Sequence, residues 1–204
     1  MLFYKAISYI FHPIVFSIIS TLLYFIILPS HITKKAEHSI LIIVFLSTYI
    51  VPILLLFFLK RFKMVHNFQL STIEERKFPV LFMIVLFSLL GKTLLDTSVV
   101  DLLAYSFLGC ALSLFFVYLL FFTKLKTSLH SLSIAGLIGF LGVISFQFKL
   151  NLLFVIILLF LIFGIVAVSR LKLKAHSMVE IYLGFFIGAL PQILTYYLFV
   201  RYSM

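Results

Sequence analysis

The stretch LNLLFVIILLFLIFGIVAV, residues 150–168, decides the fold. It has no charged residue, and its length approaches the roughly 20 apolar residues that a helix needs to cross the hydrocarbon core of a bilayer. Polar and apolar residues do not alternate along it, as they would in the strands of a membrane barrel. The stretch therefore predicts a membrane-spanning helix.

The whole chain has the same character. Its 204 residues are 64% hydrophobic and its mean hydropathy is +1.29, beyond what a soluble domain can bury. We expect an all-α, polytopic membrane helix bundle with six to seven transmembrane helices, formed by residues 1–204 as one integral-membrane domain. The third apolar segment is short and could be re-entrant, and His12-Pro13 predicts a kink or a helix entry. The apolar segments are 6–28, 39–59, 79–95, 99–122, 131–147, 150–168 and 177–199.

All eight glycines fall inside these apolar segments. Gly136, Gly139 and Gly142 share one segment, while Gly184 and Gly188 form a small-xxx-small pair in another. Small residues let helix backbones approach closely in lipid. The fifth and seventh segments are therefore expected to form the tightly packed centre.

The net charge of +10 is concentrated in the short connections between apolar segments. Counting crossings places three connections, 60–78, 123–130 and 169–176, on one membrane face, which the positive-inside rule would make cytoplasmic. If some of these basic residues are catalytic, they do not count toward the rule, and the difference in basic residues between the two faces becomes smaller. The side of the membrane on which the charged connections lie therefore stays open. The pattern suits anionic headgroups or phosphates, and no nucleic-acid partner is expected. The basic residues of this face are Lys60, Arg61, Lys63, Arg76, Lys77, Lys124, Lys126, Arg170, Lys172 and Lys174.

Three charged clusters each stand at the start of an apolar segment: EERKFP at 74–79, KTSLH at 126–130 and SRLKLKAHSMVE at 169–180. Helix N-termini would add unpaired N–H groups and a partial positive charge to these basic residues. The combined site is therefore expected to attract a phosphate.

His176 and Glu180 are four residues apart and would share a helix face. Glu180 could then accept a hydrogen bond from one ring nitrogen and fix the tautomer of the other, which makes His176 a plausible nucleophile. His130 is the other histidine at a helix start and could protonate the leaving alkoxide. Arg170 and Arg76 would hold the phosphate oxygens, because a guanidinium fork matches phosphate geometry.

The spacing of Ser169-Arg170, His176 and Glu180 resembles the third signature of the type-2 phosphatidic acid phosphatase family, in which an Asp usually fills the last place. Thr127-Ser128-Leu129-His130 is similar to its Pro-Ser-Gly-His signature, and Arg76 to Pro79 echoes the first signature. The order of these three stretches along the chain and the distances between them are also similar to those of the family's signatures. The resemblance covers roughly residues 60–199.

The resemblance implies an integral-membrane lipid phosphatase without metal or cofactor, in the bacterial inner membrane. It would hydrolyse a lipid phosphomonoester or pyrophosphate with His176 as nucleophile, Glu180 as its orienting partner and His130 as general acid. Ser128 would join the two arginines in binding phosphate. The sequence has Gln69 where the first signature has its Lys, so Lys77 or Lys126 would substitute. Leu129 replaces the signature glycine.

Simpler interpretations remain open for several of these residues. Lys172 and Lys174 could anchor in headgroups, Arg76 could be a topological anchor, and Ser128 could be only a helix cap. The lone Cys110 gives no disulfide framework, and no metal-ligand spacing is seen. Leu129 and the eroded first signature favour an alternative: a non-catalytic lipid-phosphate binding or transport protein of the same fold. A structural membrane subunit is a third interpretation, and a homo-oligomer is compatible with all of them.

Overall fold

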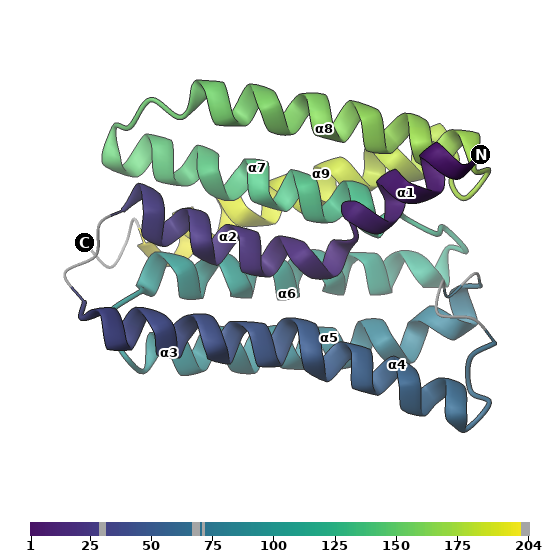
Figure 1. The fold of residues 1–204 in the computed structure, drawn as a ribbon, viewed down its shortest axis with the longest axis horizontal. Helices are drawn as coiled ribbons and strands as arrows, with labels where there is room; N and C mark the ends of the chain where they lie inside the picture. Colours follow the sequence, from purple (N-terminus) through teal and green to yellow (C-terminus); the bar gives the residue numbers. More distant parts are fainter. Residues whose placement is uncertain (29–31, 67–69, 71, 201–204) are drawn as a thin grey trace. The chain divides into compact units, whose positions relative to one another are not determined.

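The structure is a computed structural model that describes residues 1–28, 32–66, 70 and 72–200 (Figure 1). Within these residues the chain is helical and no strand occurs. Six helices are long and apolar enough to cross a membrane, and a bent pair of shorter helices makes up to seven. The expected membrane helix bundle and its count of spans are confirmed.

The chain divides into two compact units, each described by itself. Unit 1 comprises residues 1–16 and 125–204, and unit 2 comprises residues 17–124. That residues 1–204 act as a single domain stays a prediction.

In unit 2 a continuous span leads into a pair of packed helices, α5 and α6. The span contains a π-helical turn, η1, just before Pro52, where the ring removes an N–H that an α-helix would use. The elements are α2 (Pro13–Ile27), which begins in unit 1, α3 (Lys34–Phe45), η1 (Leu46–Ile50), α4 (Val51–Arg61), α5 (Ile73–Leu95) and α6 (Asp101–Phe122).

Helix α5 begins earlier than the apolar pattern predicts. A capping box starts it: the Thr72 hydroxyl accepts from the Glu75 N–H at 3.3 Å, and the Glu75 carboxylate accepts from the Thr72 N–H at 3.3 Å. These bonds satisfy two N–H groups at the helix start, and the helix continues through the four charged residues at 74–77 before Pro79. The continuous 23-residue helix is long and apolar enough to span a bilayer, although the expected apolar segment at 79–95 is short.

Unit 1 is built around α7, most of whose side chains are buried. Helices α9 and α8 both pack against it, and Figure 1 shows α1 lying along α8 near the end that leads into α9. The elements are α1 (Leu2–Ile10), α7 (Leu129–Phe148), α8 (Leu153–Lys172), α9 (Met178–Thr195) and η2 (Tyr196–Val200).

Glycines bring the backbones of α7 and α9 into contact. A Cβ atom at Gly184 would lie 2.6 Å from the Ser128 carbonyl oxygen, and one at Gly139 would lie 2.8 Å from the Ala189 carbonyl oxygen. These distances are shorter than side chains tolerate, so only glycine allows the approach. The expectation that the fifth and seventh segments pack tightly is confirmed. Two glycines of α7 are exceptions: a Cβ at Gly136 would meet its nearest atom at 3.6 Å, an ordinary contact, and one at Gly142 would meet nothing within 4 Å.

The first apolar segment is broken in the middle. Helix α1 ends at Ile10, α2 begins at Pro13, and the two are bent by 46°. Proline is favoured in the first turn of a helix, where no N–H is needed. The kink expected at His12-Pro13 is therefore confirmed.

Candidate functional site

The turn between α8 and α9 holds His176 in place. Helix α8 closes with Lys174 in the left-handed region at φ 52°, and the Ala175 N–H donates to the Arg170 carbonyl at 3.0 Å. Ser177 then begins α9 with a capping box to Glu180. Because both helix ends are fixed by hydrogen bonds, the intervening His176 has a defined position.

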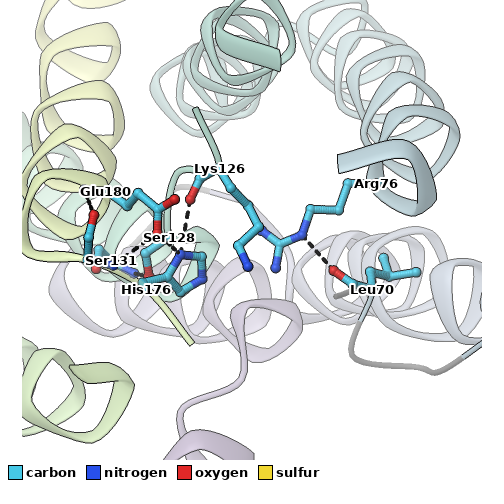
Figure 2. A network of polar contacts seen from close by, with 8 residues as sticks. Leu70, Arg76, Lys126, Ser128, Ser131, His176 and Glu180 are labelled. Carbon is cyan, nitrogen blue, oxygen red and sulfur yellow. Dashed lines mark hydrogen bonds and ion pairs between the residues drawn. The ribbon is translucent and has the colours of Figure 1, made fainter. Parts of the chain in front are cut away.

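Two acceptors bind the same nitrogen of His176 (Figure 2). Its Nδ1 lies 3.0 Å from Oε2 of Glu180 and 3.0 Å from the backbone carbonyl oxygen of Lys126. Both partners accept hydrogen bonds at neutral pH, so Nδ1 must carry the proton and, in the neutral ring, Nε2 carries the lone pair. The His176 side chain is only 1% exposed, which fixes the ring between these partners.

The start of α7 is tied to the same turn. The Ser128 N–H donates to the Glu180 carbonyl at 3.1 Å, and the Ser128 hydroxyl accepts from the Ser131 N–H at 3.4 Å (Figure 2). Ser128 is thus the N-cap of α7, as the simpler interpretation of its role predicts. Gly184 allows this contact, because its missing side chain makes room for the Ser128 carbonyl.

His130 has the opposite tautomer. Its Nε2 lies 3.1 Å from the backbone carbonyl oxygen of Ser8, which can only accept, so Nε2 carries the proton. The ring also meets His12 edge to face, with ring centroids 5.6 Å apart. His12, Arg170 and His176 all lie close enough for their charges to act on the His130 ring.

Arg170 begins a directed chain of hydrogen bonds to α1. Its Nη1 donates to the Ser8 hydroxyl at 3.3 Å, and the Ser169 hydroxyl donates to the Tyr4 carbonyl at 2.6 Å. The single hydroxyl proton of Ser169 is already donated to the Tyr4 carbonyl. The Ser8 hydroxyl must therefore donate to the Ser169 oxygen, which lies 3.2 Å away. Nε of Arg170 is buried and has no hydrogen-bond partner among the described residues. Such an orphaned donor costs about 1–3 kcal/mol, which is typical of a group awaiting a ligand.

Unit 1 therefore holds six of the seven residues that the sequence assigns to the site. They are Lys126, Ser128, His130, Arg170, His176 and Glu180. The pairing of His176 with Glu180 is confirmed by its distance. The phosphate-binding roles of Lys126, Ser128 and Arg170 stay predictions.

Arg76 belongs to unit 2. It is buried there, and its Nε donates to the Leu70 carbonyl at 2.7 Å. Its role beside the residues of unit 1 stays a prediction. Gln69, which stands in place of the first-signature Lys, lies outside the described residues.

The hydrogen-bonded residues of unit 1 around His130, Arg170 and His176 form a polar cluster. Two of its members were not assigned to the site from the sequence. Ser8 was given no role, and His12 was interpreted only as part of a kink. Both are polar residues in an otherwise apolar segment, and that is the signal that could have drawn attention to them. Helical spacing does not relate them, because α1 ends at Ile10, before His12.

The cluster combines an imidazole whose Nδ1–H is held by two acceptors, a second imidazole that donates from Nε2, and a guanidinium with a buried spare donor. Such a set can supply a nucleophile, a proton donor for a leaving group and a binding group for an oxyanion. Within the described ranges, no three His, Cys or carboxylate side chains are grouped to hold a metal ion. Comparison of the chain with protein-family models, with curated proteins and with solved structures gives no match.

Proposed function

We propose that this integral membrane protein is a lipid phosphatase that cleaves a phosphomonoester or pyrophosphate through a phosphohistidine intermediate. The observation that carries the proposal is that the two histidines donate from different ring nitrogens. His176 donates from Nδ1, so its neutral ring has the lone pair on Nε2, whereas His130 donates from Nε2. One ring is thus suited to attack and the other to donate a proton, and both lie in unit 1.

In the first step His176 Nε2 attacks phosphorus, and the bond from phosphorus to the leaving oxygen breaks. His130, protonated on both ring nitrogens in the complex with the anionic phosphate, gives its Nε2 proton to that oxygen and is left neutral. The carboxylate of Glu180, 3.0 Å from Nδ1, stabilises the positive charge that the His176 ring gains. Arg170 binds the phosphoryl oxygens, and its orphaned Nε supplies a donor for one of them.

In the second step a water molecule attacks the phosphohistidine. His130, now neutral with its lone pair on Nε2, accepts a proton from this water, and the bond between phosphorus and His176 breaks. Inorganic phosphate leaves and both rings return to their starting protonation states. Arg76, Lys126 and Ser128 are proposed as further phosphate ligands on the strength of the family resemblance.

The substrate belongs to the lipid phosphates, because the site residues stand at the ends of α7, α8 and α9, three helices able to span a bilayer. Candidates are phosphatidic acid, phosphatidylglycerophosphate and undecaprenyl pyrophosphate. The family resemblance further suggests the bacterial inner membrane as the location.

Phosphate release from these three lipids by detergent-purified protein tests the proposal. We expect release in EDTA, inhibition by orthovanadate, and loss of release in His176→Ala. The matched control is His38→Ala, an exposed histidine of α3 in unit 2, which should keep wild-type release. Full release by the His176 variant, or a strict requirement for Mg²⁺, would contradict the proposal.

A second candidate is a non-catalytic lipid-phosphate binding or transport protein. The observation that favours it is the bond from His130 to Ser8, which occupies the proton that catalysis needs. The replacement of the signature glycine by Leu129 also favours a non-catalytic protein. Saturable binding of a lipid phosphate without release of inorganic phosphate would support this candidate instead.

A further inference from the structure

The C-terminal end of α1 meets two hydrogen-bond donors, His130 and Arg170. The Ser8 carbonyl binds His130 and the Ser8 hydroxyl binds Arg170, at 3.1 and 3.3 Å. Ser8 lies in the last turn of α1, which ends at Ile10. Carbonyls of a last helical turn lack intrahelical partners and carry the partial negative charge of the helix. Helix α1 thus presents acceptor oxygens and negative charge to the donors of the cluster.

These contacts use groups that the proposed reaction also needs. The Nε2–H of His130, which the proposed reaction uses, is donated to the Ser8 carbonyl. It cannot at the same time be donated to the leaving oxygen of a substrate. Similarly, Nη1 of Arg170 points to Ser8 while its Nε has no partner. An oxyanion that accepts the Nε2 proton of His130 must therefore displace the Ser8 carbonyl.

We infer that α1 is an intramolecular competitor for the anion site. Its last turn, centred on Ser8, stands where the ligand's oxygens would bind, and α1 separates from α8 when a lipid phosphate enters. This inference rests on the proposed function, because it assumes that His130 and Arg170 bind the phosphate.

Helix α1 is suited to such movement. It has nine residues, of which only Ile7 and Ser8 are buried. Its other large apolar side chains, those of Leu2, Phe3, Tyr9 and Ile10, are exposed. A short element with few buried side chains opens at low cost, and these exposed side chains suit a lipid environment.

A disulfide between α1 and α8 tests the inference. The Ser8 and Ser169 hydroxyl oxygens are 3.2 Å apart, so sulfur atoms at both positions can reach one another. The variant carries Ser8→Cys and Ser169→Cys, with Cys110→Ser to remove the native thiol. Orthovanadate binding is measured by thermal shift, and phosphate release from phosphatidic acid by colorimetry. We expect oxidation to weaken vanadate binding at least tenfold and to abolish release, and dithiothreitol to restore both.

The single variants Ser8→Cys and Ser169→Cys, each with Cys110→Ser, are the matched controls. Each has one thiol and should respond equally with and without oxidant. If the oxidised double variant binds vanadate as tightly as its reduced form, the competitor role of α1 is wrong.

Ile7→Ser is the second test, because it loosens α1 without removing a polar group of the cluster. Apparent affinity rises with the fraction of molecules in the binding-competent state, so we expect vanadate to bind at least about threefold more tightly. A fall in affinity would instead make Ser8 a positioning residue and overturn the inference. Absence of both vanadate binding and phosphate release in every form, wild type included, would overturn the proposed function itself.

Discussion

Gly184→Ala should separate α7 from α9 at the point where the site is assembled. A Cβ at Gly184 would lie 2.6 Å from the Ser128 carbonyl oxygen and 3.2 Å from the Ser131 Cβ. Ordinary van der Waals contact begins near 3.4 Å, so the first distance is short by about 0.8 Å. The clashing atom is backbone in the first turn of a helix and has no rotamer by which to move away.

The expected cost follows from two opposing terms. Overpacking a tight contact costs about 1–3 kcal/mol, and the backbone clash places this site near the upper end. Alanine recovers about 1 kcal/mol, because it is a better helix former than glycine. The net loss is about 2 kcal/mol, or a fall in Tm of about 4–8 °C for a chain of this size.

Gly142→Ala is the matched control on α7. A Cβ there meets nothing within 4 Å, so only the helical gain of about 1 kcal/mol applies and Tm should be unchanged or slightly raised. Thermal unfolding of both variants in the same detergent measures the difference. Under the proposed function, Gly184→Ala should also slow phosphate release about 10²-fold, because a shift near 1 Å misplaces Ser128 relative to His176. Equal Tm values for the two glycine variants would refute the close packing of α7 on α9.

Three further variants test the turn before α9. Ser177→Ala removes the hydroxyl that caps α9 at 3.3 Å and should cost about 1 kcal/mol, measured as a lower Tm. Lys174→Gly relieves a side chain at φ 52° and should stabilise by up to about 1 kcal/mol, whereas a lower Tm would show that the lysine makes a needed contact. Glu180→Gln keeps an oxygen for the His176 proton but removes the charge, so phosphate release should fall on the order of 10²-fold with Tm nearly unchanged. Wild-type release in this variant would argue that the carboxylate plays no part in the reaction.

The sequence by itself determined the features that depend on neighbours along the chain. The uninterrupted apolar stretch at 150–168 predicts α8, because no charged residue occurs in it and its length suits a bilayer. The four-residue spacing of His176 and Glu180 predicts their contact, since one helical turn brings them together. Helix boundaries were predicted less well than the helices themselves. The apolar segment at 79–95 does not show that α5 begins at Ile73, because a capping box, and not hydropathy, sets the start of this helix.

Only the tertiary structure decided which helix faces meet. Ser8 contacts His130 and Ser169 across separations of 122 and 161 residues, and no local pattern indicates either pairing. In lipid every helix is apolar on most sides, so hydrophobicity does not select the face that packs; close fit and interhelical hydrogen bonds do. The tautomers of His176 and His130 have the same origin, because each is set by a backbone carbonyl, of Lys126 or of Ser8, that any residue type could supply.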